Sequence, residues 1–241
     1  MKIDKLAVVI PTYNERETLP SLIDELLVEI RKIAEKFFIV VIDDASPDGT
    51  GQLAEELNKK YGNITIIHRR AKLGLGSAYK EGFRLALDKF DPDFIVQMDA
   101  DHSHNPKEIP QMLQKFQEYD FVVASRHVLG SAVVGWGAYR KILHTTASKL
   151  AVICGGIKIL DPTSGFRVFK KNVLNSVDFA KIKSEGFAFQ IELLCLLKKM
   201  GFKGFEFPTR YVYRKEGKSK MGISEAIQFM KTCLYLLMKH V

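Results

Sequence analysis

The sequence predicts one α/β domain built on a mostly parallel, doubly wound sheet, with a C-terminal extension. The first observation is an alternation, over the first 125 residues, of short apolar runs rich in Val, Ile and Phe with amphipathic stretches. The second is that no internal repeat, low-complexity segment or linker interrupts the 241 residues. Strand–helix alternation implies right-handed crossovers, and ligands of such sheets bind beyond the carboxyl ends of the strands.

In the first half we expect strands at 6–10, 38–43, 64–68, 94–98 and 121–124, and helices near 18–36, 49–60, 76–89 and 108–117. The first helix has an apolar face made of Leu19, Leu22, Ile23, Leu26, Leu27, Ile30 and Ile33. Asn105 before Pro106 is typical of a helix start, with Asn as the cap and Pro at the first position.

After residue 125 the pattern is less regular. We expect a helix over 138–154, a strand over 166–170, a helix over 188–200 and strands over 202–207 and 210–213. A basic loop, 214–222, then leads into a last helix over about 223–239.

The composition, 46% hydrophobic and 27% charged, is that of a folded globular protein. No apolar run reaches the roughly 18 residues that a membrane-spanning helix needs, and the N-terminus lacks a signal-peptide layout. The three cysteines (Cys154, Cys195 and Cys233) lie far apart and lack a Cys-x-x-Cys spacing. This pattern predicts reduced, buried thiols in a cytosolic protein.

Charge divides the chain. Residues 1–120 hold 16 Lys and Arg against 21 Asp and Glu, whereas residues 121–241 hold 20 against 7. The basic half suits a phosphate ligand, an anionic membrane surface or nucleic acid.

Polar residues follow the predicted strands and should meet at one edge of the sheet: Pro11 to Glu15, Asp43-Asp44, Arg69-Arg70, Asp99-Ala100-Asp101 and Ser125-Arg126. Gathering carboxylates and guanidinium groups at one edge costs free energy unless ligands or solvent contact them. In an extended chain Asp99 and Asp101 point the same way, which suits Mg²⁺ or Mn²⁺, cations that bridge substrate phosphates. The alternative is a polar turn into the next helix.

His102 and His104 raise the alternative of a zinc site. Zinc needs four ligands, and no second cluster stands out because the remaining histidines (68, 127, 144 and 240) show no pairing. The sequence therefore favours loop residues that start the next helix.

Gly74-Leu75-Gly76, with Gly82 nearby, resembles a dinucleotide-binding loop. It follows the third strand rather than the first, with intervening residues, so a tight turn into a helix is favoured.

The basic loop holds Arg214, Lys215, Lys218 and Lys220. It is either a solvated hairpin tip or a lid that closes over a diphosphate. Aromatic residues do not interleave with it, which argues against nucleic acid.

The last helix has an apolar stripe: Ile223, Ile227, Met230, Leu234 and Leu237. Core packing, dimerisation and an interfacial membrane helix all remain open, and the 138–154 helix is similar.

Several motifs together resemble family 2 glycosyltransferases: "VVIPTYNE" (8–15), "VIDDASPDGT" (41–50), "MDADHSHNP" (98–106), "ASR" (124–126) and "TSGFRVF" (163–169). Within that family, "SEGFAFQIEL" (184–193) and "RKEGKSKMG" (214–222) resemble the dolichol-phosphate mannose synthases. The resemblance covers nearly the whole chain.

The resemblance implies a nucleotide-diphospho-sugar transferase (GT-A) fold with a catalytic domain at 1–222 and an amphipathic helix at 223–241. The domain would comprise a nucleotide-sugar and metal half (1–125) and an acceptor half (126–222). The implied donor is GDP-mannose and the implied acceptor a dolichyl or polyprenyl phosphate. We expect the enzyme to be peripheral on the cytoplasmic face of a membrane, with a possible membrane-anchoring partner subunit and without a nucleic-acid partner.

By motif position, the resemblance implies these donor-binding residues: Pro11, Tyr13, Glu15, Ile42, Asp44, Asp99, Ala100, Asp101, Arg126, Arg214 and Lys220. Asp101 would bind the metal, Mg²⁺ or Mn²⁺, with Ser103 as the positional match for a further ligand. Arg126 and Arg140 would receive the acceptor phosphate, and with Asp101 they are the expected catalytic residues. Relatives place a serine four residues after the second arginine, where this chain has His144.

Transfer of a sugar to a lipid phosphate is consistent with the residues of the second half of the chain. A phosphate monoester is largely ionised at neutral pH, because its second pKa lies near 6, so it needs no general base to act as a nucleophile. The second half correspondingly offers no obvious base carboxylate. We expect inverting transfer that gives a β-mannosyl phosphate. The alternatives are another donor, such as UDP-glucose, or a non-catalytic protein that binds membrane surfaces or nucleic acid.

Overall fold

The computed structural model describes residues 3–213 and 223–240. They form a seven-stranded sheet in the order β3-β2-β1-β4-β7-β5-β8, in which only β7 runs antiparallel to its neighbours. The strands are β1 (Ile3–Thr12), β2 (Ala34–Asp43), β3 (Ile64–His68), β4 (Phe94–Gln97), β5 (Phe121–Ser125), β7 (Arg167–Lys170) and β8 (Gly204–Pro208). A separate parallel pair joins β6 (Ala132–Val134) to β9 (Arg210–Val212). The predicted mostly parallel sheet is confirmed.

The α-helices are α1 (Leu19–Ile30), α2 (Thr50–Tyr61), α3 (Leu75–Phe90), α4 (Ile109–Leu113), α5 (Ala138–Gly155), α6 (Lys171–Asn175), α7 (Gly186–Lys199) and α8 (Ile223–His240). Short 3₁₀ turns lie at Pro106–Glu108, Gln114–Gln117 and Phe179–Lys181. The first of these starts as predicted, because the Asn105 side chain accepts a hydrogen bond from the Lys107 N–H.

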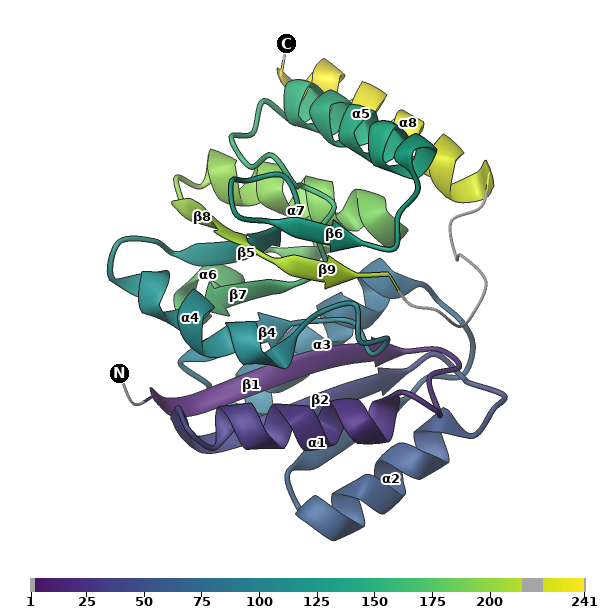
Figure 1. Ribbon diagram of the computed structural model, residues 1–241, viewed down its shortest axis with the longest axis vertical. Helices are drawn as coiled ribbons and strands as arrows, with labels where there is room; N and C mark the ends of the chain where they lie inside the picture. Colours follow the sequence, from purple (N-terminus) through teal and green to yellow (C-terminus); the bar gives the residue numbers. More distant parts are fainter. Residues whose placement is uncertain (1–2, 214–222, 241) are drawn as a thin grey trace.

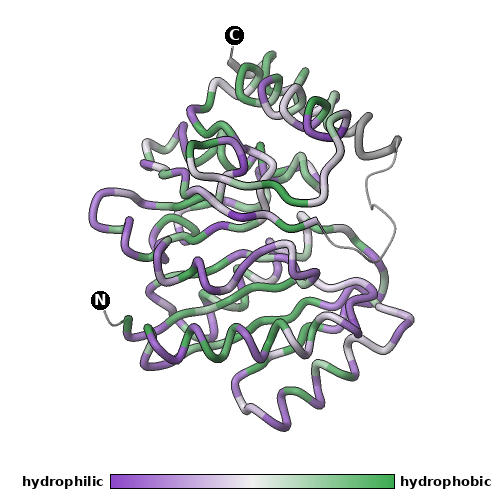
Figure 2. The backbone as a smooth tube through the Cα atoms, in the orientation of Figure 1, coloured by the Kyte–Doolittle hydropathy of each residue, from purple (hydrophilic) through white to green (hydrophobic). Residues whose placement is uncertain are grey.

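Two hydrophobic cores flank the sheet, because successive side chains of a strand face opposite sides. Along β1, Leu6, Val8 and Ile10 join the core that contains α1, α2 and α4. Ala7 and Val9 join the other core, which contains α3, α6 and α7. Hydrophobic and hydrophilic residues alternate along α1, as an amphipathic helix on a sheet requires (Figure 2).

Helices α5 and α8 pack side by side and outside α7, at one end of the molecule (Figure 1). The three cysteines lie on these helices and are free and buried, as predicted. Within residues 3–213 and 223–240, none of the helices combines the length and the hydrophobicity of a membrane-spanning segment.

The boundaries of α1 differ from the prediction. The apolar pattern suggested a helix over 18–36, but α1 ends at Ile30 and β2 begins at Ala34. Residues 34–36 pair with the start of β1, so strand pairing overrides the helical pattern there. Ile33 nevertheless packs against the predicted core. The sequence also missed β6, α6 and the turn at Phe179–Lys181, which are too short to produce a clear period.

Candidate active site

A cavity of about 370 Å³ opens at the carboxyl ends of the parallel strands. Ten residues predicted from the motifs line it: Pro11, Tyr13, Glu15, Asp44, Asp99, Ala100, Asp101, Ser103, Arg126 and Arg140. The predicted meeting of strand ends at one edge therefore accounts for most of the cavity. The Ile42 side chain lies instead in the core, and Arg214 and Lys220 lie outside the described residues.

Asp44 has two partners that hold its carboxylate in place. Its Oδ1 accepts a hydrogen bond from Arg69 Nη1 at 2.5 Å, and its Oδ2 accepts one from the Gly74 N–H at 3.0 Å. Both Asp44 and Arg69 are buried. Asp44 thus fixes the Gly74 turn as well as facing the cavity.

Hydrogen bonds to Tyr79 and His104 fix the position of Asp99. Its Oδ1 accepts a hydrogen bond from the hydroxyl of the fully buried Tyr79 at 2.9 Å, and its N–H donates to His104 Nδ1 at 3.0 Å. Burial, together with the Asp99 charge, raises the pKa of Tyr79 well above its ordinary value, so Tyr79 remains a donor. The carboxylate of Asp99 is 35% exposed towards the cavity.

The two aspartates face one cavity for a reason other than the predicted one. Strand β4 ends at Gln97, before Asp99, so they do not share an extended strand. The chain turns instead: Asp101 Oδ1 accepts a hydrogen bond from the Ser103 N–H at 3.1 Å, and His102 adopts a positive φ of 56°.

His102 and His104 point to different partners. His102 Nε2 lies 2.8 Å from Ser21 Oγ on α1, whereas His104 stacks on Phe166 and accepts from Asp99. These contacts support the preference for loop residues over a zinc site.

Gly74 and Gly76, at the start of α3, leave room for the side chain of Glu185 from the second half of the chain. A Cβ on Gly76 would lie 2.7 Å from Glu185 Oε2 and 3.0 Å from Phe189 Cβ. Glu185 Oε2 accepts a hydrogen bond from the Ser77 N–H at 2.8 Å, and its Oε1 lies 3.6 Å from Lys80 Nζ. The glycines thus serve helix packing, as the tight-turn interpretation predicted.

On the other side of the cavity, aromatic rings flank the two arginines. Arg126 lies 5.6 Å from the ring centroid of Trp136 and 5.2 Å from that of Tyr211. Arg140, in the first turn of α5, lies 5.4 Å from Trp136 and 4.3 Å from Tyr213. Such cation–π contacts hold guanidinium groups in place.

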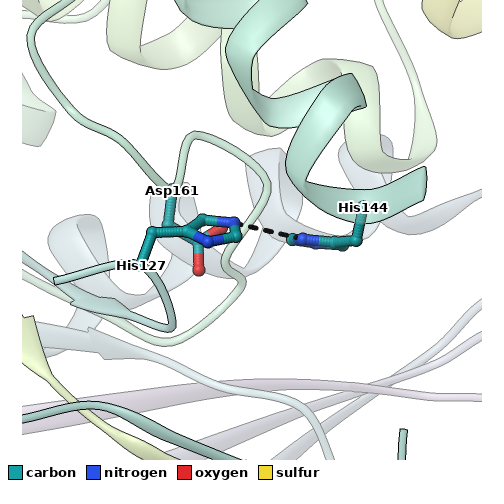
Figure 3. Close-up of side chains that lie close together, drawn as sticks. All are labelled: His127, His144 and Asp161. Atoms are coloured by element: carbon teal, nitrogen blue, oxygen red, sulfur yellow. Dashed lines mark hydrogen bonds between the residues drawn. The ribbon is translucent and has the colours of Figure 1, made fainter. Parts of the chain in front are cut away.

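The prediction that His127 and His144 are unpaired is wrong. His127 Nε2 lies 3.2 Å from His144 Nδ1, and the two ring centroids are 5.2 Å apart (Figure 3). With Asp161 they form a group whose ligand atoms lie within 4.8 Å of one another. The sequence does not reveal this pair because the two histidines are 17 positions apart, with strand β6 between them.

Sequence reasoning also missed several cavity residues: Lys72, Thr163, Glu185, Phe187, Tyr211 and Tyr213. Thr163, Glu185 and Phe187 stand inside motifs recognised for the family, and Tyr211 and Tyr213 alternate along a predicted strand. Those signals were available without the structure. Lys72 lies 3.9 Å from the ring centroid of Tyr13 and had no comparable signal.

The cavity lies at the carboxyl ends of the parallel strands, where open α/β sheets bind their ligands, with acidic residues at one side and arginines at the other. The chain belongs to glycosyl transferase family 2, whose family model matches residues 7–178. It is therefore a glycosyltransferase.

Two curated relatives match almost the full chain. The undecaprenyl-phosphate mannosyltransferase of Micrococcus luteus is 35% identical over 92% of this chain and 91% of its own length. The polyprenol monophosphomannose synthase of Mycolicibacterium smegmatis is 37% identical over 92% of this chain and 83% of its own length.

Solved structures share the GT-A fold. Glucosyl-3-phosphoglycerate synthase from Mycobacterium tuberculosis matches with a TM-score of 0.65 and 20% identity, over 97% of this chain and 80% of that one. A mannosyltransferase from Pyrobaculum calidifontis, solved with GDP-Man and Mn²⁺, matches with a TM-score of 0.62 and 17% identity, over 100% of this chain and 64% of that one.

Proposed function

We propose that this glycosyltransferase transfers mannose from GDP-mannose to a dolichyl or other polyprenyl phosphate, with inversion. The main support is one cavity in which carboxylates that follow strands β2 and β4 lie on one side and Arg126 and Arg140 lie on the other. The names of the two curated relatives, both polyprenol-phosphate mannosyltransferases, support this choice of sugar and acceptor.

The nucleotide end of the donor would lie against Pro11, Tyr13, Glu15 and Asp44, with the backbone near Ile42 and Ala100 beside it. Asp99 would also contact the nucleotide side of the donor. Arg214 and Lys220, from the basic loop, are proposed to contact the diphosphate, and they lie outside the described residues. Positioning by several groups at once is what a transferase needs to orient its donor.

The residues present fit a divalent cation, Mg²⁺ or Mn²⁺. Asp101 and Ser103 offer oxygen atoms at the cavity, and hard cations take oxygen ligands and share them with substrate phosphates. His104 Nδ1 accepts a hydrogen bond from the Asp99 N–H, so this nitrogen is not available as a metal ligand. When bound, such a cation offsets the negative charge that develops on the diphosphate leaving group.

Arg126 and Arg140 would receive the acceptor phosphate. One of its oxygens forms a bond to C1 of mannose while the bond from C1 to the GDP oxygen breaks, and GDP leaves with that electron pair. In-line attack converts an α-linked donor into a β-linked product. The phosphate is already ionised, so no side chain has to remove a proton. Glu185, the second-half carboxylate at the cavity, is correspondingly engaged by Ser77 and Lys80.

The outer face of α5 and α8 is proposed to lie on the membrane that holds the lipid acceptor. Large apolar side chains are exposed on both helices: Tyr139, Ile142, Leu143 and Ile153 on α5, and Met230, Leu234, Leu237 and Met238 on α8. Basic residues Lys141, Lys149 and Lys231 are also exposed there. Apolar residues flanked by lysines are typical of an interfacial helix, and Arg140 on the same α5 would meet the lipid phosphate.

Sedimentation with liposomes tests this surface. Replacing Ile142 and Leu234 by Asp should release the protein from vesicles that contain anionic lipid. The matched control is Val28→Asp, because Val28 is 58% exposed on α1, far from α5 and α8 (Figure 1). Equal release by the control and the test variant would contradict the membrane surface.

A transfer assay with purified protein tests the function directly. GDP-mannose, a short polyprenyl phosphate and either Mg²⁺ or Mn²⁺ should give a β-mannosyl phospholipid, and UDP-glucose should give at least tenfold less product. Equal or faster transfer from UDP-glucose would contradict the proposed donor. Transfer that survives excess chelator would contradict the role of the cation.

A further inference from the structure

Arg126 is held in place by a buried carboxylate, that of Asp161, which lies outside the family motifs. Asp161 is fully buried, and its Oδ2 accepts hydrogen bonds from Arg126 Nε at 2.7 Å and from the Arg126 N–H at 2.9 Å. Its Oδ1 accepts one from Arg126 Nη2 at 2.8 Å. This two-point pairing fixes the plane of the guanidinium group.

The pairing also determines which part of Arg126 meets the cavity. Nε and Nη2 are directed to Asp161, and Nη2 also donates to Thr163 Oγ1 at 3.0 Å. The Arg126 side chain is only 10% exposed. The remaining nitrogen, Nη1, is therefore the edge that Arg126 offers to a ligand.

Asp161 remains charged despite its burial. Burial alone would raise the pKa of its carboxyl, but the charge and hydrogen bonds of Arg126 outweigh that effect and hold the pKa well below its ordinary value. The pair is therefore neutral overall. Arg140 also faces the cavity, but no carboxylate among the described residues forms an ion pair with it. Its positive charge is therefore not neutralised in the way that Asp161 neutralises Arg126.

A directed chain of hydrogen bonds leads to Asp161. Thr163 Oγ1 donates to Asp161 Oδ1 at 3.2 Å, so it must accept from His144 Nε2, which lies 3.1 Å away. His144 Nδ1 then lacks a proton and accepts from His127 Nε2 (Figure 3). Burial, reinforced by the Arg126 charge, lowers the pKa of His144 to about 3, so this neutral form persists at neutral pH.

The same three residues resemble a metal-binding group, but their bonds oppose that interpretation. Both Asp161 oxygens are already occupied by Arg126 and Thr163. The His127 and His144 nitrogens that face each other share a hydrogen bond. A metal would have to break the Arg126 pair and leave a buried guanidinium uncompensated, which is costly.

We propose that Asp161, supported by Thr163 and His144, is a positioning residue that orients Arg126 towards the acceptor phosphate. This inference rests on the proposed function, in which Arg126 contacts that phosphate. Because Asp161 neutralises the charge of Arg126, it contributes to the orientation of the guanidinium group rather than to the affinity for the acceptor phosphate. A misplacement of the reacting group by about 1 Å costs on the order of 100-fold in rate.

Trp136 provides a direct probe of this region. It is the only tryptophan of the chain and lies 5.6 Å and 5.4 Å, ring centroid to guanidinium carbon, from Arg126 and Arg140. Its fluorescence can therefore report binding of a short polyprenyl phosphate without any turnover. Single-turnover transfer from GDP-mannose measures the chemical step separately.

In Asp161→Asn, the amide NH₂ faces Arg126 donors and the guanidinium is released. We expect the lipid phosphate to bind as tightly as in the unchanged protein, or up to threefold more tightly, and single-turnover transfer to slow at least about 30-fold. Donor affinity should stay within twofold. Thr163→Val, a milder change, should slow transfer about three- to tenfold. Its matched control is Thr65→Val, on the edge strand β3.

Transfer by Asp161→Asn within threefold of the unchanged protein would overturn the inference. Equal losses in donor and acceptor affinity would also overturn it, because they indicate a merely structural role. Stoichiometric Zn²⁺ binding that His144→Gln abolishes would assign the cluster to a metal instead. If the unchanged protein neither binds the lipid phosphate nor transfers mannose, the proposed function itself fails, and the positioning role with it.

Discussion

The two sides of the cavity are built by different means. On the donor side, Asp44, Asp99 and Asp101 follow strands β2 and β4 of the parallel sheet, so the sheet topology brings them to one edge. On the acceptor side, Arg126 depends on Asp161, 35 residues further along the chain, and Arg140 stands on a helix outside the sheet layers. Parallel strands thus position one substrate, whereas a buried ion pair and an outer helix position the other.

The largest expected effect is on the donor side. Asp101→Ala removes the proposed cation ligand, and we expect mannosyl transfer to fall at least about 1000-fold, or about 4 kcal/mol in the barrier. The matched control is Asp88→Ala, because Asp88 is exposed on α3. Steady-state assays with GDP-mannose and polyprenyl phosphate measure both. Substantial activity in Asp101→Ala would contradict the cation site.

Substitutions on the acceptor side should lower the stability of the protein as well as its activity. Arg126→Gln leaves Asp161 buried without its cation, so we expect the free energy of unfolding to fall by about 3 kcal/mol. The double variant with Asp161→Asn should recover part of this loss, because it removes the uncompensated charge. Chemical denaturation measures both. Additive losses in the double variant would indicate that the ion pair does not hold the acceptor side together.

The contact between the two sides, at Gly76 and Glu185, gives a smaller effect. In Gly76→Ala the new Cβ meets Glu185 Oε2 and Phe189 Cβ at 3.0 Å or less, and we expect a loss of about 1–2 kcal/mol of stability. Gly137→Ala is the control, because a Cβ there meets nothing within 4 Å. Thermal melts that shift equally for both would show that the close contact is tolerated.

Acidification should weaken the acceptor side gradually. His144 has a folded pKa of about 3 against 6.5 in the unfolded chain, so between these values the unfolded state binds more protons and stability falls as the pH falls. The lowered pKa of Asp161 acts in the same direction below about pH 4. His144→Gln should therefore show a shallower loss between pH 6.5 and 4 in denaturation curves. An unchanged slope would contradict the neutral, buried state of His144.

The donor side was largely predictable from the sequence. Continuous apolar runs predicted the first five strands, and polar residues after each run predicted the cavity edge. The turn after β4 was not predictable in detail, because an Asx-like contact from Ser103 to Asp101 replaces the expected extended pair.

The acceptor side was predictable only in part. Family resemblance indicated Arg126 and Arg140, but neither Asp161 nor the His127–His144 pair has a local pattern in the sequence. Their roles depend on tertiary contacts: β7 runs antiparallel between β4 and β5, and the segment before it brings Asp161 beside Arg126. Periodicity does not encode such contacts.

We propose that separate sets of residues hold the donor and the acceptor. Calorimetry with GDP-mannose plus Mg²⁺, and separately with a short polyprenyl phosphate, tests it in Asp101→Ala and Arg140→Gln. We predict that Asp101→Ala weakens GDP-mannose binding at least about tenfold and changes lipid phosphate binding less than twofold, and that Arg140→Gln does the reverse. Comparable weakening of the binding of both ligands in both variants would show that the two substrates share one set of residues.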